Sequence, residues 1–401
     1  MPKTIAVIGA LDTKGPEFAF VKAEIERRGH RALVVNTAVV GAPTFEPDIS
    51  AERVAEAGGA SLAALRAQAD RGAAMEVMTR GVARVVKDLY DEGKIDGVLG
   101  MGGSAGTIIG TSAMRALPVG VPKVMVSTLA SGDVKPYVGT KDVVMIHSVV
   151  DVAGVNRVSA RIYANAVGAM VGMVETSTPQ IASRPVIAAS MFGNTTPVVT
   201  RCRETFEKRG FEVLIFHAVG TGGQTMEDLI RAGYVNGVAD ITTTEWADEL
   251  VGGVLTAGPE RLDAAAEKGV PQVIAPGCLD MVNFWARETV PAQFEGRRFY
   301  PWNPNVTLMR TTPEENAELG RILAEKASQS SGPVAFFLPL KGVSMLDAPG
   351  KEFWWPEADQ ALFDAIQKYR RPDIPVHELD HNINDEPFAD AVAEKLLEFL
   401  K

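Results

Sequence analysis

The sequence lacks the features that mark secreted and membrane-spanning proteins. It has two cysteines, Cys202 and Cys278, in 401 residues, which is too few for a disulfide framework. Its apolar runs, such as Ala164–Val174, are shorter than the about 20 residues that a membrane span needs. The apolar run Ile5–Leu11 has neither the basic flank nor the cleavage site of a secretory signal. These absences predict a cytoplasmic protein with no membrane partner.

The chain also has little positive charge. Its 40 lysines and arginines are outnumbered by 50 aspartates and glutamates, which gives a net charge of −10, and no long run of basic residues occurs. Nucleic-acid binding depends on a basic surface that neutralises phosphates. We therefore expect no nucleic-acid partner.

Glycine and proline are abundant, with 38 and 24 residues. Both cluster where short runs of Val, Ile and Leu end, as they do in turns after buried strands. Continuous apolar strands that alternate with helical segments are typical of a parallel sheet covered on both faces. The strands expected in the first half are Thr4–Ile8, Ala32–Asn36, Gly97–Gly100 and Lys123–Val126.

The second half repeats the plan of the first. Pro16 and Pro197, each expected at the start of a helix, lie 181 residues apart, and the helix ends ERRG and EKRG keep that spacing. Gly97 then corresponds to Gly237 at a spacing of 140, so the second half lacks part of the polar helical region that precedes Gly97. The ordered matches predict an α/β protein of two related Rossmann-like, doubly wound parallel-sheet domains, 1–183 and 184–401, that face a cleft.

Two further predictions concern the helices. In a helix over Val152–Val174, the small residues Ala164, Gly168 and Gly172 lie four apart, which favours close packing in the core over a seam between subunits. The tail is expected to extend the second sheet through a helix from Pro313, a strand Val334–Leu338, a helix Glu357–Arg370, a strand Ile374–Val376 and a C-terminal helix.

Ligands of open α/β sheets bind beyond the carboxyl ends of the strands. One such end carries Gly100–Thr107 (GMGGSAGT), between a strand and a helix. Bare N–H groups and a helix N-terminus attract phosphate, and Ser104 and Thr107 add hydroxyl donors. No acidic residue lies near position 120 to hold a ribose, and no Walker loop occurs, so NAD and an ordinary P-loop are disfavoured. The alternative is a glycine turn that serves only the packing of helix on strand.

A neighbouring strand end carries the turn LDTKG. Lys14 could meet phosphate oxygens, and Asp12 could bind Mg²⁺ directly or through water. The later turn Ser131–Asp133 offers Asp133 as a second magnesium contact. The alternative for Asp12 and Lys14 is a helix N-cap followed by a solvated lysine.

The turns of the second domain carry acceptors and hydroxyls that suit a small anionic metabolite. Cys278 among them could be a nucleophile, although free cysteines are more commonly buried and inert. We expect Lys341 and Glu245 to act with Asp12 as catalytic residues that face the phosphates. The expected substrate contacts are Asn194, Thr195, Thr196, Gly222, Thr243, Thr244, Gly277, Cys278 and Asp280.

His377–His381 (HELDH) matches the zinc-protease signature H-E-x-x-H. That chemistry requires both histidines on one face of a helix. Pro372 and Pro375 precede the motif, and Ile374 and Val376 alternate as in a strand. We therefore interpret the segment as a strand and expect no zinc.

Several longer motifs together carry a family resemblance: GALDTKG, GMGGSAGT, STLASGD, GNTTP, TTTE, PGCLDMVNF, FYPWNPNVTLMRTTPEE and FFLPLKGVSMLDAPG. They occur in order along the whole chain, which resembles the bacterial relatives of the inhibitory domain of the tomato mosaic virus resistance protein. The resemblance implies two Rossmann-like subdomains, a homodimer or higher homo-oligomer, and ATP with Mg²⁺ in the first subdomain. The implied nucleotide contacts are Asp12, Thr13, Lys14, Gly102, Gly103, Ser104, Gly106, Thr107, Thr128, Ala130, Ser131, Gly132 and Asp133.

The leading hypothesis is an ATP-binding enzyme that acts on a small anionic metabolite in the cleft between the domains. The first alternative is a nucleotide-responsive dimeric regulator or scaffold without catalysis. The second is a hydrolase or lyase that works without a nucleotide.

Overall fold

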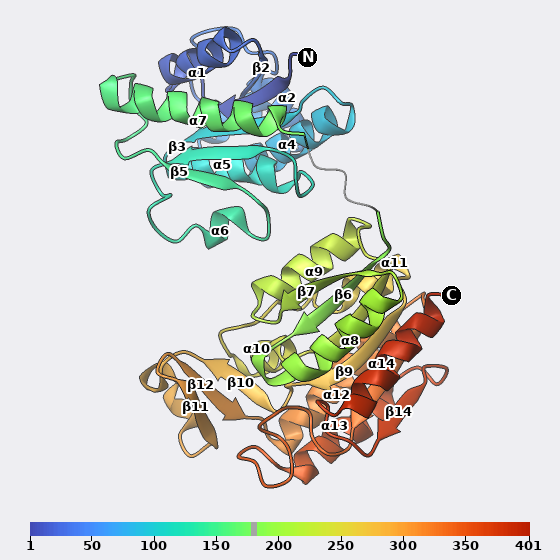
Figure 1. The fold of residues 1–401 in the computed structure, drawn as a ribbon. Helices are drawn as coiled ribbons and strands as arrows, with labels where there is room; N and C mark the ends of the chain where they lie inside the picture. The colour runs from blue at the N-terminus through green and yellow to red at the C-terminus, as the bar shows by residue number, and fades with distance from the viewer. Residues whose placement is uncertain (178–182) are drawn as a thin grey trace. The chain divides into compact units, whose positions relative to one another are not determined.

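The computed structural model describes residues 1–177 and 183–401, which form two compact units, Met1–Gln180 (unit 1) and Ile181–Lys401 (unit 2) (Figure 1). Each unit is built around one parallel sheet with helices on both faces. The predicted Rossmann-like α/β class is confirmed. Within the described residues, no helix combines the length and the apolar composition that crossing a membrane requires.

Unit 1 has a five-stranded parallel sheet in the order β2-β1-β3-β4-β5. Side chains alternate between its faces: Ala6 and Ile8 of β1 pack on the α2–α5 side, and Ile5 and Val7 pack on the side of α1 and α7. The strands are β1 Thr4–Gly9, β2 Arg31–Asn36, β3 Gly97–Gly102, β4 Lys123–Ser127 and β5 Val144–His147. The helices are α1 Gly15–Arg27, α2 Ala51–Ala57, α3 Leu62–Gln68, α4 Arg71–Asp91, α5 Ser104–Arg115, α6 Lys135–Val138 and α7 Arg157–Glu175.

Unit 2 has a six-stranded parallel sheet in the order β14-β13-β9-β8-β6-β7. Its strands are β6 Val186–Met191, β7 Glu212–His217, β8 Gly237–Thr242, β9 Gln272–Gly277, β13 Val334–Pro339 and β14 Val376–Leu379. Helices α8 Thr196–Lys208 and α14 Glu386–Phe399 cover one face. The other face carries α9 Thr221–Arg231, α10 Glu245–Val251, α11 Asp263–Lys268, α12 Pro313–Ser328 and α13 Pro356–Tyr369. The tail extends this sheet, as predicted.

Unit 2 also contains a small antiparallel sheet that our sequence analysis did not predict. Its order is β10-β12-β11, and its strands are β10 Met281–Phe284, β11 Phe299–Asn303 and β12 Val306–Arg310. The buried Phe284 and Met309 belong to the cluster that covers one face of the main sheet. The small sheet is thus packed onto the core of unit 2.

The two units share the start of their fold. Helices α1 and α8 have 13 residues each, and the residues that precede them, Lys14 and Thr195, both have a φ of −125°. Gly29 and Gly210 follow these helices with φ of 84° and 90°, which a side chain disfavours. The units differ between the second and third strands, where unit 1 has α2, α3 and α4 and unit 2 has α9 alone.

Three local predictions were wrong in detail. The helix expected from Val152 begins at Arg157, because Asn156 accepts hydrogen bonds from the backbone N–H groups of Val158 and Ser159 and caps it. Gly172 is exposed, and a Cβ built there meets nothing within 4 Å, whereas Ala164 and Gly168 are partly buried, so the expected close packing does not extend to Gly172. The strand expected at Ile374–Val376 forms later, as β14.

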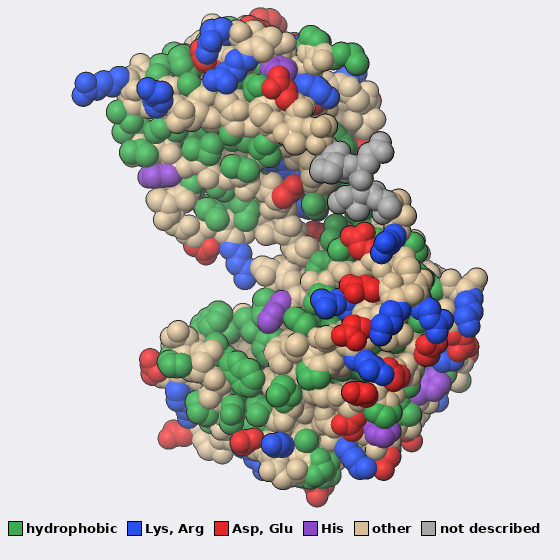
Figure 2. All heavy atoms as spheres, in the orientation of Figure 1, with side chains coloured by type: hydrophobic (Ala, Val, Ile, Leu, Met, Phe, Trp, Pro, Cys, Tyr) green, Lys and Arg blue, Asp and Glu red, His purple; other side chains and the backbone are tan. Residues whose placement is uncertain are grey.

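On the face of unit 2 drawn in Figure 2, basic and acidic side chains are interspersed. That face offers no continuous basic area of the kind that binds nucleic acid.

Candidate nucleotide site and buried polar clusters

A cavity of about 740 Å³ lies in unit 1 at the carboxyl ends of β1, β2 and β3. The chain adds β2 on one side of β1 and then returns to add β3 on the other. Such a reversal opens a crevice beyond the strand ends, where open α/β sheets bind ligands. The turns after β1 and β3, predicted to act together, both line this cavity through Asp12, Thr13, Lys14, Gly102, Gly103, Ser104 and Gly106.

The glycines of the loop after β3 have two different roles. A Cβ on Gly102 would lie 2.8 Å from the Cα of Gly106, so these two positions let β3 approach the first turn of α5. A Cβ on Gly103 would meet only the Thr128 Oγ1, at 3.7 Å. Gly102 and Gly106 therefore serve packing, whereas Gly103 leaves open space at the cavity wall.

Helix α5 begins at this loop without a side-chain cap, since Gly103 is its N-cap residue. The first N–H groups of a helix have no partner inside the helix, and the helix dipole adds a partial positive charge there. An anion that approaches Gly103 can accept hydrogen bonds from these groups.

The two charged side chains of the turn after β1 differ in whether they have a hydrogen-bond partner. The carboxylate of Asp12 accepts a hydrogen bond from the Gly41 N–H at 2.9 Å, which holds the loop after β2 in place. Lys14 is partly buried, lines the cavity, and has no hydrogen-bond or ion-pair partner for its ammonium within the described residues. A partly desolvated cation without a partner favours an anionic ligand.

The opposite wall is apolar and comes from the extra helices of unit 1. Leu65 of α3 and Ala74, Met75 and Met78 of α4 line it, together with Ile109 of α5. These residues were not predicted from the sequence. The sequence did contain a signal for this wall. The helical region before Gly97 has no counterpart in the second half of the chain, and that region supplies most of the wall.

Thr107 and the predicted nucleotide contacts in the turn after β4 do not line this cavity. Within the described chain, Thr107, Thr128, Ala130, Ser131, Gly132 and Asp133 are absent from the cavity lining. Thr107 is buried and donates to the Gly103 carbonyl at 2.8 Å, and Asp133 accepts from the N–H of Lys135, the first residue of α6. Asp151, after β5, lines the cavity instead.

The corresponding edge of unit 2 is filled by the chain's own side chains. At the spacing of 140 residues, Gly102 and Gly103 correspond to Thr242 and Thr243. The Thr242 Oγ1 lies 2.7 Å from the Thr195 Oγ1, and Thr243 donates to the Ala275 carbonyl. Of the predicted substrate contacts, Asn194, Thr195, Thr243, Thr244, Gly277, Cys278 and Asp280 are buried, Gly222 is partly buried, and Thr196 is exposed.

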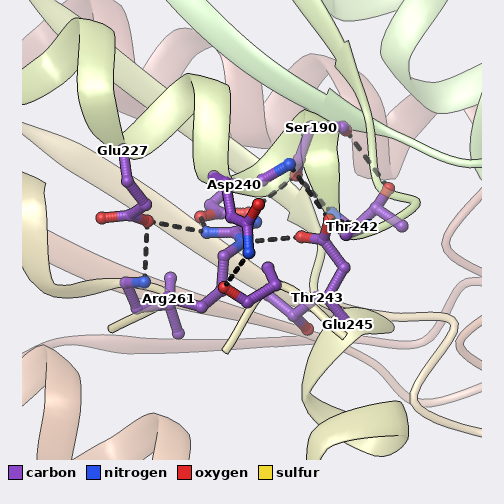
Figure 3. A network of polar contacts seen from close by, with 12 residues as sticks. Ser190, Glu227, Asp240, Thr242, Thr243, Glu245 and Arg261 are labelled. Atoms are coloured by element: carbon purple, nitrogen blue, oxygen red, sulfur yellow. Dashed lines mark hydrogen bonds and ion pairs between the residues drawn. The ribbon is translucent and has the colours of Figure 1, made fainter. Parts of the chain in front are cut away.

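Glu245, predicted as catalytic, is 1% exposed and belongs to a buried network around Arg261 (Figure 3). Its Oε2 accepts from the Arg261 Nε at 2.8 Å, and its Oε1 accepts from the N–H groups of Gly220 and Gly223. Gly220 and Gly223 flank the start of α9, so this carboxylate is the anion at that helix N-terminus. The placement gives Glu245 a structural role.

Two more carboxylates surround Arg261. Asp240 receives two hydrogen bonds from the guanidinium at 2.6 Å and one from Ser190, and Glu227 accepts from the Leu262 and Ala264 N–H groups (Figure 3). Burial raises the pKa of Glu227 and of Glu245, and the Arg261 charge opposes that rise. Because every carboxylate has donors, the network holds together the turns before α9, α10 and α11.

Lys341, the other predicted catalytic residue, is exposed. Its ammonium lies 2.9 Å from Asp380 in the connection between β14 and α14. In the sheet order, β9 lies between β13, which precedes Lys341, and β8, which precedes Glu245. The structure therefore does not bring Lys341 and Glu245 together within unit 2, and their expected approach to the phosphates of unit 1 stays a prediction.

A second buried cluster has more acids than bases. Asp280, Asp347 and Asp359 are at most 4% exposed and share one cation, Arg310, which lies 2.7 Å from Asp359 and 3.6 Å from Asp347. One oxygen of each carboxyl has no hydrogen-bond partner among the described residues. Burial raises the pKa of Asp280 to about 7 and that of Asp359 to about 8, and the Asp347 charge adds to both rises.

The surroundings of Cys278 and His377 decide between the alternatives that the sequence left for them. Cys278 is fully buried, which raises the pKa of its thiol well above the usual value, so it lacks the thiolate character of a nucleophile. His377 lies in β14 and stacks on Phe337 at 4.7 Å, which confirms the strand interpretation of HELDH. Among the described residues, no three His, Cys, Asp or Glu side chains are grouped to hold a metal ion.

Comparison with known proteins gives matches over the whole chain. Residues 3–179 match the family described as "Uncharacterised protein family (UPF0261) N-terminal domain", and residues 184–400 match its C-terminal domain. A UPF0261 protein of Clostridium tetani is 52% identical, with 100% of both chains covered. A UPF0261 protein of Rhizobium meliloti is 47% identical, with 97% of both covered. The tomato protein "ToMV resistance protein Tm-1(GCR237)" is 44% identical over 82% of this chain and 45% of its own length.

Removal of the buried arginine tests the network in Figure 3. Arg261→Ala leaves three buried carboxylates without their cation and is expected to lower the free energy of unfolding by about 3–5 kcal/mol. The control is Arg231→Ala in α9, whose exposed pairs with Glu260 and Glu267 are worth less than about 1 kcal/mol. Urea unfolding measures both, and equal losses would contradict the structural role of Arg261.

The acidic cluster predicts a pH dependence of stability. The pKa values of Asp280 and Asp359 are higher in the folded chain than the usual value of 3.8, so the folded state keeps protons that the unfolded chain releases. The free energy of unfolding of unit 2 is therefore expected to fall as the pH rises from about 4 to about 8, by up to about 1.4 kcal/mol per pH unit for each carboxyl.

Asp359→Asn, which imitates the protonated acid, should flatten this decline. Asp364→Asn, on the exposed side of the same helix α13, should leave it unchanged. Urea titrations at several pH values measure the slopes. A wild-type slope that Asp359→Asn does not alter would show that Asp359 is ionised throughout.

Proposed function

The chain belongs to the UPF0261 family, and we propose that its N-terminal unit binds ATP with Mg²⁺ in the cavity at the ends of β1 and β3. The observation that carries the proposal is the uncapped N-terminus of α5 beside the open position at Gly103. Lys14, a cation without a partner in the described chain, lines the same cavity. Together they offer N–H donors and a positive charge to phosphate oxygens.

The rest of the cavity suits the other parts of a nucleotide. The apolar wall of Leu65, Met75, Met78 and Ile109 can take a planar base, and a volume near 740 Å³ is in the usual range of small-molecule pockets. Carboxylates are the ligands that Mg²⁺ prefers, and Asp12 and Asp151 line the cavity. Asp133, the second carboxylate that the sequence suggested, lies outside this lining.

The proposal extends to an enzyme that uses the nucleotide on a small anionic metabolite. A second candidate is a nucleotide-responsive regulator or scaffold, which acts as a homo-oligomer and catalyses no reaction. The buried state of Thr195, Thr243 and Glu245 favours this second candidate, because these side chains are committed to the interior of unit 2. Turnover of ATP with candidate anionic metabolites separates the two.

Gly103→Val tests the phosphate site. The branched side chain would occupy the open space at the cavity wall and is expected to weaken binding of ATP with Mg²⁺ by about 100-fold or more. The fold should survive, since the Cβ meets only the Thr128 Oγ1 at 3.7 Å. Isothermal titration calorimetry measures the affinity, and thermal unfolding checks the fold.

The matched control is Gly172→Val, at an exposed position of α7 where a Cβ meets nothing. It should bind ATP as the wild type does. An unchanged ATP affinity in a folded Gly103→Val protein would refute the site.

A further inference from the structure

The junction between α3 and α4 places an arginine on the wall of the cavity. Ala69 turns the chain with a φ of 50°, and the Asp70 carboxylate accepts from the N–H groups of Gly72 and Ala73 at 2.8 and 3.1 Å. This cap fixes the first turn of α4, whose first residue is Arg71. Arg71 lines the cavity that also holds Lys14 and the start of α5.

Arg71 is exposed on the wall of the cavity. Its guanidinium has no hydrogen-bond or ion-pair partner in the part of the chain that the structure describes. A cation in the first turn of a helix also lies at the end where the helix dipole disfavours positive charge. Arg66, on the same wall, differs, because its Nε donates to the Val39 carbonyl and ties α3 to the loop after β2.

The three cations and three carboxylates of the cavity lining sum to no net charge, but they differ in whether an internal hydrogen bond holds them. Asp12 is bound to the Gly41 N–H, Asp70 caps α4, and Arg66 is bound to Val39. The lining then keeps two cations, Lys14 and Arg71, and one carboxylate, Asp151, without a hydrogen-bond or ion-pair partner in the described residues. With the N-terminus of α5, this set suits a ligand that carries several negative charges.

We propose that Arg71 binds the phosphate chain of the nucleotide and, with Lys14, makes the site selective for nucleoside polyphosphates over nucleosides and monophosphates. This inference rests on the proposed function and names its ligand class more narrowly. A guanidinium binds two phosphate oxygens at once through its planar fork. Lys14 comes from the turn after β1 and Arg71 from the helices that unit 1 has in addition, so the extra helices supply charge as well as an apolar wall.

Unit 2 supports this interpretation by contrast. Its single helix between the second and third strands is α9 (Thr221–Arg231). The N–H groups of its N-cap residue Gly220 and of Gly223 in its first turn both donate to the internal carboxylate of Glu245. The repeated fold thus satisfies a helix N-terminus with its own acid in one unit. In unit 1 the described chain leaves a helix N-terminus and two cations to an external anion.

The test measures affinities for ATP with Mg²⁺, AMP and adenosine by calorimetry, in the wild type and in Arg71→Ala. We expect the substitution to weaken ATP binding by about 10- to 100-fold and to leave adenosine binding unchanged. Arg71→Lys, which keeps the charge but not the fork, should weaken ATP binding less.

The matched control is Arg157→Ala. Arg157 is also an exposed first residue of a helix with a side-chain N-cap, and it lies outside the cavity lining. It should bind all three ligands as the wild type does, and thermal unfolding should show all variants folded.

The outcomes separate this inference from the proposed function. A wild type that binds no ATP would overturn both. If the wild type and Arg71→Ala bind ATP with equal affinity, the proposed ATP site stands, but the role of Arg71 is overturned. An equal loss of ATP and adenosine affinity would also overturn it, because the arginine would then act on the base or on the shape of the cavity.

Discussion

A helix that begins at the carboxyl edge of a parallel sheet leaves N–H groups without partners, and the two halves of this chain satisfy that need differently. In unit 2 the Glu245 carboxylate accepts from the N–H groups at the start of α9. In unit 1 the loop after β3 has glycine where unit 2 has threonine, and α5 starts without a cap. Helix α10, which follows the threonines of unit 2, also starts without a side-chain cap, but the residues before it are buried among unit 2's own side chains, whereas the start of α5 borders a cavity.

Closure of the edge in unit 2 requires buried charge. Glu245 needs a cation, and Arg261 supplies it, but Arg261 then also joins Asp240 and Glu227. Charges of this kind are expensive to desolvate and stay charged only when each is paired and hydrogen-bonded. The network in Figure 3 meets this condition. The Asp280, Asp347 and Asp359 cluster does not, since it has one arginine for three acids, and burial raises the pKa of each acid.

Much of the fold could be predicted from the sequence, because the signals are local. Apolar runs that end in glycine gave the strands, Pro16 and Pro197 gave the helix starts, and their common spacing gave the repeat. The small antiparallel sheet was missed because its strands are short and pair across loops that carry no periodic pattern. The start of α7 was placed too early because the cap at Asn156 depends on one side chain and not on periodicity.

The site could be predicted only in part. The turns after β1 and β3 were found because a glycine-rich loop between a strand and a helix has a physical meaning on its own. The apolar wall and Arg71 were missed, because the sequence of the additional helices α2–α4 does not show which of their faces meets the edge of the sheet. Glu245 was interpreted as catalytic because nothing in the sequence Thr242–Glu245 (TTTE) indicates that Arg261 lies against it. Burial and ion pairing are three-dimensional, and they turn the same residue type from a reactive group into a structural one.

Amide hydrogen exchange tests the central claim most directly, because it reports the N–H groups on which the account depends. Without nucleotide, the amides of Gly220 and Gly223 should exchange slowly, and those of Ser104, Ala105 and Gly106 should exchange fast. Added ATP with Mg²⁺ should slow the exchange of Ser104, Ala105 and Gly106 and leave Gly220 and Gly223 unchanged. Slow exchange at Ser104–Gly106 before any nucleotide is added, or no change there at saturating ATP, would contradict the account.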